Sequence, residues 1–284
     1  MQSVSPDVRR RYDALVRAAD SLVVGLDFDG TLAPIVDDPA EAALHPAAAE
    51  ALTLLGARIR AVAVVTGRPV RQVLDLGALE EVGAAFATEG SAGPHELLVL
   101  GQYGNERWSS TSRTIVSAVP PPGLAAVTAE LPRLLADLGL DPWIEEKGLA
   151  VAVHTRRMPQ PEQAFAVLLP ALTRLAHAHG LQVEPGRLVI EVRAPGMDKG
   201  RAVRRLVAEL DPGGFCFAGD DLGDVEAFEA VRELSESGMP TLLVCSGSRE
   251  ENALVKLADV VVPGPDGVVE LLRGLVADID RQRG

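Results

Sequence analysis

The chain has 284 residues, which suits a large domain that carries an insert. Apolar residues make up 47% of it and aromatic residues only 4%, so valine, leucine and alanine must build the core. Its 40 acidic and 27 basic residues give a net charge of -13, which argues against nucleic-acid or anionic-membrane partners. A small anionic substrate stays compatible with this charge if a metal ion or a few cations reverse the local field.

The N-terminal segment predicts a helix and not a signal sequence. Ser5, Pro6 and Asp7 are typical of a helix start, and apolar residues follow on one helical face. No apolar run approaches the length that crosses a membrane. Cys216 and Cys245 lie in apolar runs without a Cys-x-x-Cys partner, so we interpret them as reduced core residues, a disulfide or metal role being the minority reading. We therefore expect a cytoplasmic protein, and we expect it to be a monomer.

Short apolar runs alternate with helical patterns along most of the chain. Continuous strands spaced by helices predict an α/β fold, with a parallel sheet that is covered on both faces. Ligands of such sheets bind beyond the carboxyl ends of the strands, and Asp27, Thr66 and Asp220 each end an apolar run. The expected strands are the runs at 22–27, 61–66, 97–102, 215–220, 241–245 and 259–263.

The middle of the chain has a different pattern, which predicts an inserted α+β domain of order αββαββ. A linker or turn at 120–126 leads into a helix that ends near Gly139. Two hairpins are expected, turning at Lys147-Gly148 and at Pro185-Gly186, with a helix over 159–180 between them, kinked at Pro170. We assign residues 114–194 to this insert, and 1–113 with 195–284 to the core.

Paired carboxylates at strand ends predict a metal site. Asp27 and Asp29 follow one apolar run, and three further aspartates follow another. Mg²⁺ prefers oxygen ligands and is typically held by one or two carboxylates together with substrate phosphate. Aspartates also form turns and cap helices, but three in five residues exceed what capping needs. The candidate metal ligands are Asp27, Asp29, Asp220, Asp221 and Asp224.

Two further positions are suited to binding a phosphoryl group. Thr66 and Gly67 offer a hydroxyl and an unhindered backbone N–H before a helix, although an ordinary turn explains them as well. Lys199 stands at the start of a predicted helix, where anions are favoured over cations. A neighbouring phosphate would explain a lysine there, and a solvated surface lysine is the alternative.

Together these segments resemble the haloacid dehalogenase superfamily of phosphotransferases. The four matching segments occur in the superfamily's order: "DFDGTL" (27–32), "VVTGR" (64–68), Lys199 and "GDDLGD" (219–224). The resemblance implies a Rossmann-like core with the insert as a cap domain. It also implies that Asp27 is the nucleophile, that Asp29 is the acid and base, and that Thr66 and Lys199 hold the phosphoryl oxygens.

Three further segments are "GQYGNERW" (101–108), "IEEKGLAVAVHTR" (144–156) and "LVIEVRAPGMDKG" (188–200). With them, the chain resembles the trehalose-6-phosphate phosphatases over nearly its whole length after the first helix. The resemblance implies sugar contacts from the cap at Glu145, Lys147 and Glu191, and a substrate contact from Arg156. It extends to Gly67, Arg68 and Tyr103 as substrate-binding positions. The chain departs from the family pattern at three positions: Tyr103 replaces a histidine, Thr155 a tyrosine and Gly223 a threonine.

The implied reaction is Mg²⁺-dependent hydrolysis of trehalose 6-phosphate through an aspartyl-phosphate, with the sugar phosphate as the only partner. Two alternatives remain open. One is a phosphatase of the same superfamily for another sugar phosphate, such as a sucrose or glucosylglycerate phosphate. The other is a non-catalytic sensor of sugar phosphates, which Asp27, Asp29, Lys199 and Asp220 argue against because a sensor could lose them.

Overall fold

The computed structural model describes residues 5–36, 38–86, 95–247 and 252–284. The chain divides into two compact units, Met1–Val116 with Asp198–Gly284 and Ser117–Met197. Both boundaries lie three residues further along the chain than the sequence predicted.

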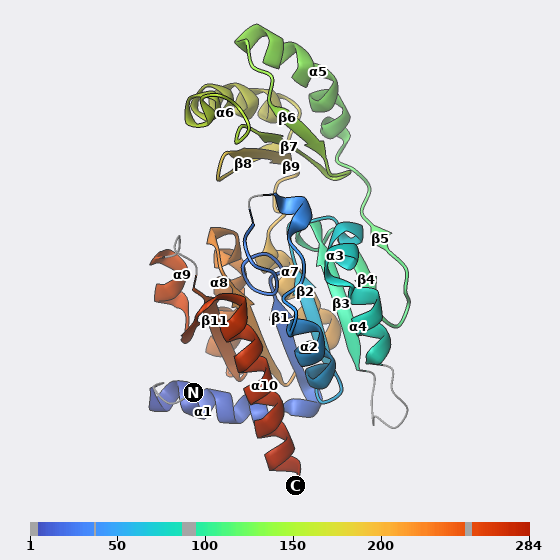
Figure 1. The fold of residues 1–284 in the computed structure, drawn as a ribbon, viewed down its shortest axis with the longest axis vertical. Coiled ribbons are helices and arrows are strands. Elements are labelled where there is room, and N and C mark those ends of the chain that lie inside the picture. The colour runs from blue at the N-terminus through green and yellow to red at the C-terminus, as the bar shows by residue number, and fades with distance from the viewer. Residues whose placement is uncertain (1–4, 37, 87–94, 248–251) are drawn as a thin grey trace. The chain divides into compact units, whose positions relative to one another are not determined.

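The first unit is built on one large sheet. Among the described residues eight strands follow the order β12-β11-β10-β1-β2-β3-β4-β5 (Figure 1). The pairs from β12 to β3 are parallel, and β4 runs antiparallel to β3. The strands are β1 Leu22–Leu26, β2 Ala61–Val65, β3 Glu96–Gly101, β4 Glu106–Ser109, β5 Val116–Ser117, β10 Gly214–Gly219, β11 Thr241–Ser246 and β12 Val260–Val262.

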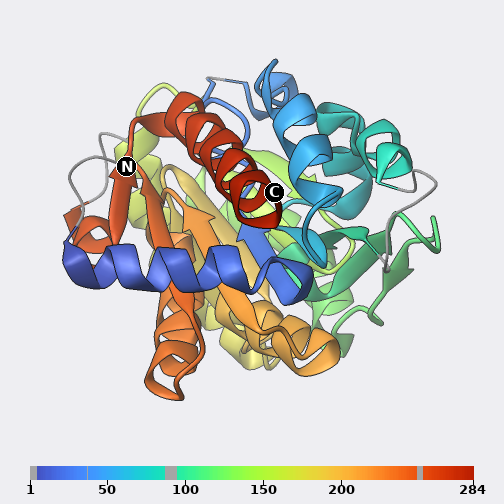
Figure 2. The ribbon, with the colours of Figure 1, turned by 90° about the horizontal axis from the view of Figure 1, so that it is seen from below.

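Helices cover both faces of this sheet, as the continuous apolar strands predicted. Val24 and Val62 point into one core cluster, while Val23 and Ala63 point into the other. In Figure 2, α2 and α10 lie on one side of the sheet and α7 and α8 on the other. The helices are α1 Pro6–Arg17, α2 Ala48–Gly56, α3 Val70–Gly77, α4 Leu79–Ala85, α7 Lys199–Leu210, α8 Val225–Glu236, α9 Asn252–Leu257 and α10 Gly264–Arg283.

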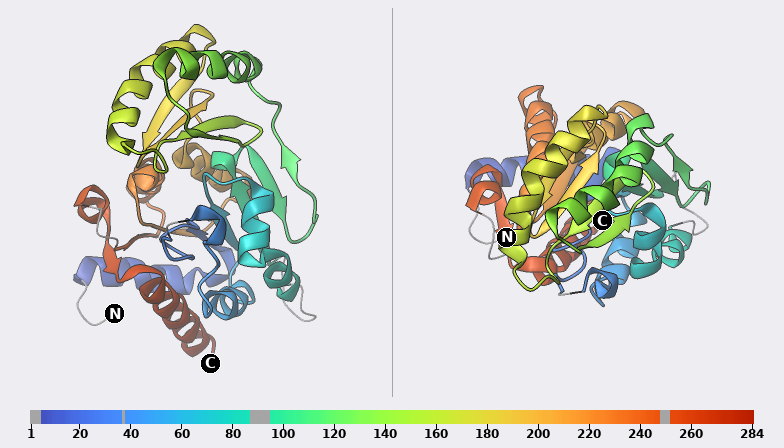
Figure 3. Two further views of the ribbon diagram at one scale, coloured as in Figure 1. Left: turned by 45° about the horizontal axis from the view of Figure 1, so that its top comes forward. Right: turned by 90° about the horizontal axis from the view of Figure 1, so that it is seen from above.

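The second unit is a four-stranded antiparallel sheet of order β6-β7-β9-β8 with two helices (Figure 3). Its element order is the predicted αββαββ. Apolar residues of both helices and of one sheet face form a single core cluster. The elements are α5 Pro122–Leu138, β6 Trp143–Glu146, β7 Ala150–His154, α6 Pro161–Ala178, β8 Gln182–Gly186 and β9 Val189–Arg193.

Two local expectations for the second unit are corrected. The helix α5 begins at Pro122, inside the expected linker, because proline is well suited to the first turn of a helix. The helix expected between the two hairpins is present as α6, and Pro170 lies inside it. The second hairpin turns at Arg187 and Leu188, not at Pro185-Gly186. Proline is tolerated within β8 because this is an edge strand, where one set of backbone groups has no ladder partner.

The sequence did not predict β4 or β5. Neither has the long apolar run that marks the central strands, and the residues of β5 are exposed. In the part of the chain that the structure describes, no helix combines the length and apolar character that crossing a bilayer requires.

Candidate active site

The three polar strand ends lie on neighbouring strands of the first unit. Asp27 follows β1, Thr66 follows β2 and Asp220 follows β10, and β1 lies between the other two strands. The parallel register aligns their ends, since Leu26 is paired with Ala218 on one side and with Val64 on the other. The backbone N–H of Asp27 donates to Ala218 at 2.9 Å, which holds the residue at this edge.

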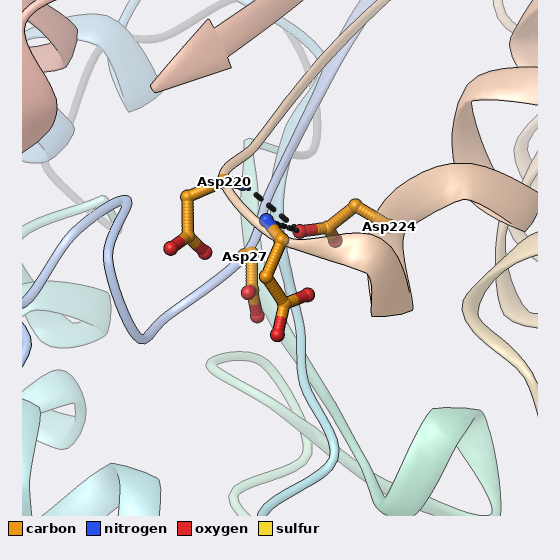
Figure 4. A group of neighbouring side chains, drawn as sticks. Asp27, Asp220 and Asp224 are labelled. Carbon is orange, nitrogen blue, oxygen red and sulfur yellow. Dashed lines mark hydrogen bonds between the residues drawn. The ribbon is translucent and has the colours of Figure 1, made fainter. Parts of the chain in front are cut away.

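Four aspartates form a cluster at this edge. Carboxylate oxygens of Asp27, Asp220, Asp221 and Asp224 lie within 4.8 Å of one another. Figure 4 shows three of them, brought together by the ends of β1 and β10 and the turn that follows β10. The cluster offers only hard oxygen donors, which fits Mg²⁺ better than a soft metal ion.

Local hydrogen bonds shape this cluster. The carboxylate of Asp224 accepts from the backbone N–H groups of Asp220, at 3.0 Å, and of Asp221, at 3.3 Å. Asp221 in turn accepts from the N–H of Gly223 at 2.9 Å, so the expected capping role coexists with membership of the cluster. Gly30 adopts a φ of +68°, and a Cβ there would come within 2.0 Å of the Asp220 carboxylate. The loop after β1 therefore needs glycine in order to pack against Asp220.

Lys199 is the cation that contacts the cluster among the described residues. Its ammonium lies 2.8 Å from Asp27 Oδ2 and 2.8 Å from Asp224 Oδ1. Its side chain is buried at the start of α7 and is not the solvated lysine of the alternative interpretation. A buried ammonium at a helix N-terminus is unfavourable by itself, and the two carboxylates compensate for it.

Burial and the repulsion between the carboxylates disfavour the charged forms of the aspartates in this cluster. Burial raises the pKa of Asp27 well above its usual range, Lys199 opposes this, and Asp224, Asp220 and Asp221 add to it. Burial, with the charges of Asp221 and Asp224, raises the pKa of Asp220 to about 8. A bound cation would lower the pKa of both residues, because it favours the charged form of each carboxylate.

The side chain of Asp29 is not part of this cluster and contacts Arg68 instead. Arg68 Nε donates to Asp29 Oδ2 at 2.6 Å and Arg68 Nη2 donates to Oδ1 at 2.7 Å, a two-pronged contact. Arg68 Nη1 donates to the backbone carbonyl of Pro39 at 2.9 Å. The structure thus brings together two residues that the sequence assigned to different tasks, proton transfer and substrate binding.

The residues that follow β2 pack against the residues that follow β3. Thr66 Oγ1 accepts from the N–H of Arg68 at 3.1 Å, and the carbonyl of Thr66 accepts from the N–H of Tyr103 at 2.9 Å. The hydroxyl of Tyr103 lies 2.8 Å from where a Cβ of Gly67 would be, so only glycine fits beneath the ring. Gln102 and Tyr103 adopt φ values of +46° and +58°, a strained conformation that three backbone hydrogen bonds hold in place.

The predicted sugar contacts Glu145, Lys147 and Glu191 are on or next to the sheet of the second unit. Glu145 pairs in register with Ala152, and Ala152 pairs with Glu191, so both glutamates share a sheet face. Lys147 Nζ lies 2.7 Å from Glu191 Oε2. Arg156 is an exposed residue that follows β7.

Sequence reasoning missed further polar residues on this face. Arg193 donates to Glu184 at 2.9 Å, and His154 Nε2 lies 3.0 Å from Glu145 Oε2. The ring of Trp143 stacks on His154 with centroids 4.3 Å apart. Alternation along the strands could have found all four residues, because each lies an even number of positions from Glu145, Ala152 or Glu191 on its strand or on a paired one.

A groove of about 740 Å³ lies elsewhere in the first unit, between α1, β12 and α10. It is lined by apolar side chains such as Val8 and by charges of both signs such as Arg9 and Asp278. None of the predicted site residues is among the described residues that line it. The chemistry of the side chains, and not the volume of a cavity, therefore identifies the candidate site.

Comparison with known proteins identifies a family and several relatives of this chain. A family model described as trehalose-phosphatase matches residues 25–90 and 142–260. An uncharacterized glycosyl hydrolase of Mycobacterium tuberculosis is 33% identical over 240 residues, which are 81% of this chain and 17% of that protein. The trehalose-phosphate phosphatase of Mycobacterium avium is 32% identical over 287 residues, 95% of this chain and 67% of that protein. The chain thus spans under a fifth of the former relative and two thirds of the latter.

The solved structures agree on the fold. The C-terminal domain of a trehalose-6-phosphate phosphatase from C. albicans superposes with a TM-score of 0.73 at 20% identity. The match covers 97% of this chain and 98% of that domain.

Proposed function

Because the chain belongs to the trehalose-phosphatase family, we propose that it hydrolyses trehalose 6-phosphate to trehalose and phosphate, with Mg²⁺ as its cofactor. The observation that carries this proposal is the cluster of four aspartates at adjoining strand ends, three of them buried, with the buried Lys199 in contact with it. A phosphomonoester resists uncatalysed hydrolysis strongly, and such a group supplies both a nucleophile and a place for a cation.

The cofactor assignment rests on the donor set of the cluster. Asp27, Asp220, Asp221 and Asp224, with the backbone carbonyl of Asp29, are the residues that would hold Mg²⁺. When bound, the ion supplies positive charge that offsets the repulsion between a carboxylate and an anionic phosphoryl group.

Asp27 is the nucleophile in this proposal. One carboxylate oxygen forms a bond to phosphorus while the bond from phosphorus to the sugar oxygen breaks, which leaves an aspartyl-phosphate. Asp29 donates a proton to the departing sugar oxygen and then accepts one from the water that hydrolyses the aspartyl-phosphate. The contact between Arg68 and Asp29 supports a shared task, in which Arg68 orients this carboxyl group and is also available to the substrate phosphate.

Thr66, Gly67 and Lys199 hold the phosphoryl oxygens in this scheme. The hydroxyl of Thr66 stands at the end of β2, one strand away from Asp27, and Gly67 presents an N–H without a side chain. The ammonium of Lys199 already contacts the nucleophile, so it can offset charge as the phosphoryl group transfers.

The second unit recognises the sugar in this proposal. Carboxylates and an ammonium suit sugar hydroxyls, since they accept and donate charge-assisted hydrogen bonds. Glu145, Lys147 and Glu191 are the proposed sugar contacts, with Arg156 as a further substrate contact. Tyr103 is proposed to contact the substrate from the first unit, beside Gly67.

The direct test is phosphate release from a panel of sugar phosphates, with Mg²⁺ and after exhaustive chelation. We expect trehalose 6-phosphate to be preferred over sucrose and glucosylglycerate phosphates, and we expect turnover to stop on chelation. Preference for another sugar phosphate would reassign the substrate and keep the chemistry. Binding of trehalose 6-phosphate with no phosphate release at any Mg²⁺ concentration would instead indicate a sensor.

We also expect a cytoplasmic monomer. Cys216 and Cys245 are both buried, and burial raises the pKa of Cys216 to about 12, so that it stays protonated. Light scattering of the purified protein would test the oligomeric state, and fractionation of the cells that make it would test its location.

A further inference from the structure

One row of side chains crosses the sheet of the second unit. Paired positions run from Glu145 through Ala152 and Glu191 to Glu184, one residue on each strand. Directly paired residues of antiparallel strands point to the same face with their Cβ atoms close together. Glu184 and Glu191 therefore lie side by side, and two like charges at such positions repel each other.

Arg193 compensates for this repulsion. It lies two residues after Glu191 on β9, so its side chain is on the same face. Its Nη2 donates to Glu184 Oε2 at 2.9 Å, and its Nη1 lies 3.4 Å from Glu191 Oε1, a longer contact that still brings opposite charges together. The planar guanidinium can reach both glutamates at once, which a single ammonium cannot do in the same way.

Glu191 consequently has a cation beside each carboxylate oxygen. Lys147 contacts Oε2 at 2.7 Å, and Arg193 faces Oε1. Without Arg193, Glu191 would be repelled by Glu184 on one side and drawn toward Lys147 on the other. The carboxylate would then turn away from its present orientation.

We infer that Arg193 is a positioning residue that sets the orientation of Glu191 for sugar binding. This inference rests on the proposed function, in which Glu191 accepts hydrogen bonds from sugar hydroxyls. Arg193 is not required to contact the substrate. It acts by tying Glu191 to Glu184, and its effect is confined to substrates that carry the sugar.

The test compares trehalose 6-phosphate with p-nitrophenyl phosphate, which has no sugar for the second unit to bind. Arg193→Met keeps the length of the side chain and removes its charge. We expect it to raise KM for trehalose 6-phosphate roughly tenfold with kcat nearly unchanged, because substrate binding is lost and not the chemical step. Its kcat/KM for p-nitrophenyl phosphate should stay within about twofold of the wild type. Arg174→Met on the exposed face of α6 is the matched control. Its KM for trehalose 6-phosphate and its kcat/KM for p-nitrophenyl phosphate should both stay at the wild-type values.

A second substitution tests the role of Glu184 directly. Glu184→Gln alone should change KM by less than about twofold, because it removes the repulsion on Glu191 together with the charged contact that offsets it, and Arg193 still faces Glu191. In the Arg193→Met background the same change removes the repulsion between Glu184 and Glu191. The double variant should therefore have a kcat/KM for trehalose 6-phosphate at least about threefold higher than that of Arg193→Met alone. Arg193→Lys should lie between wild type and Arg193→Met, since one ammonium cannot keep both contacts.

The outcomes separate the inference from the proposed function. If the wild type does not hydrolyse trehalose 6-phosphate, the proposed function fails before any variant is compared. The inference fails if the wild type hydrolyses trehalose 6-phosphate and Arg193→Met keeps the wild-type KM for it. It also fails if Arg193→Met lowers kcat/KM equally for trehalose 6-phosphate and p-nitrophenyl phosphate. Should Arg193→Met not fold, Arg193→Lys decides: a wild-type KM for trehalose 6-phosphate overturns the inference, and a selective increase supports it.

Discussion

The two acidic regions of this protein differ in how their charge is balanced. In the first unit, four clustered aspartates face one contacting cation, Lys199, among the described residues. In the second unit, Glu191 contacts Lys147 and Arg193, Glu184 contacts Arg193, and His154 lies beside Glu145. One region is left with excess negative charge, while each of these glutamates in the other has a basic partner.

This difference follows from the kind of ligand that each region would bind. A site for a divalent cation must keep its negative charge uncompensated, at a cost in stability while the cation is absent. A site for a neutral sugar gains nothing from net charge, and it needs acceptors and donors held in fixed orientations. Charge balance therefore separates a metal site from a sugar site even though both are rich in acidic residues. The predictions below test this separation, from the largest expected effect to the smallest.

Asp27→Asn should have the largest effect. It removes the nucleophile, so we expect phosphate release from both substrates to fall more than about a thousandfold. Asp75→Asn, on an exposed face of α3, is the control and should be unchanged. Near-native turnover in Asp27→Asn would refute the assignment of the nucleophile.

Asp29→Asn should be comparably slow and yet differ in binding. Its side chain contacts Arg68 and not the acidic cluster, so Mg²⁺ affinity should stay close to that of the wild type. Calorimetric titration with Mg²⁺ measures this directly. A large loss of Mg²⁺ affinity would mean that the Asp29 carboxylate belongs to the metal site after all.

Lys199→Met should destabilise the first unit by about 3–5 kcal/mol, because it leaves buried carboxylates without their contacting cation. Added Mg²⁺ should restore part of this loss, since it supplies the missing positive charge. Urea unfolding at pH 8 with and without Mg²⁺ measures both quantities, and activity on both substrates should fall alike. The same loss of stability with and without Mg²⁺ would show that Lys199 does not serve to balance the cluster.

Glu145→Ala and Glu191→Ala should act on one substrate only. A charge-assisted hydrogen bond to a sugar hydroxyl is worth about 1.5–3 kcal/mol. We therefore expect kcat/KM for trehalose 6-phosphate to fall roughly ten- to a hundredfold and that for p-nitrophenyl phosphate to stay the same. If both variants keep the wild-type ratio of the two values, the second unit does not recognise the sugar through these glutamates.

The smallest effect concerns pH. Because burial and neighbouring carboxylates raise the pKa of Asp220 to about 8, the native metal-free protein holds a proton that the unfolded chain releases near pH 4. The contribution of this group to stability is therefore full at low pH and is lost as pH rises toward 8. Mg²⁺ must displace the proton, so its affinity should weaken by up to about tenfold per pH unit below 8.

Thermal shifts on adding Mg²⁺ at pH 6 and at pH 8 measure this dependence. The shift should be larger at pH 8, where less proton competes with the ion. An equal shift at the two pH values would contradict the excess negative charge that we assign to the cluster.

The sequence allowed the main strands and their polar ends to be predicted, because long apolar runs leave few other structures open. β1, β2 and β10 are where the runs before Asp27, Thr66 and Asp220 predicted them. β4 and β5 escaped prediction because their residues alternate weakly or are exposed. The left-handed backbone at Gln102 and Tyr103 has no local signal either, since neither residue type favours it.

Side-chain partners were the part that could not be predicted. Arg68 and Asp29 are 39 positions apart, and both had been assigned separate tasks. Arg193 follows Glu191 by two positions, yet its contact with Glu184 depends on the register of β8 against β9, and the turn that sets this register was expected at the wrong residues.

The sequence by itself determined the class of fold, the order of the main elements and which strand ends carry carboxylates, because these depend on local hydrophobic patterns and on the types of residue in each segment. Only the tertiary structure decided that Asp27, Asp220, Asp221 and Asp224 come together, with Lys199 in contact with the first and the last of them, while Glu184 and Glu191 are bridged by Arg193. The physical reason is that charge compensation acts over a few ångströms in space, and strand order and register, which no local pattern encodes, determine which charges come that close.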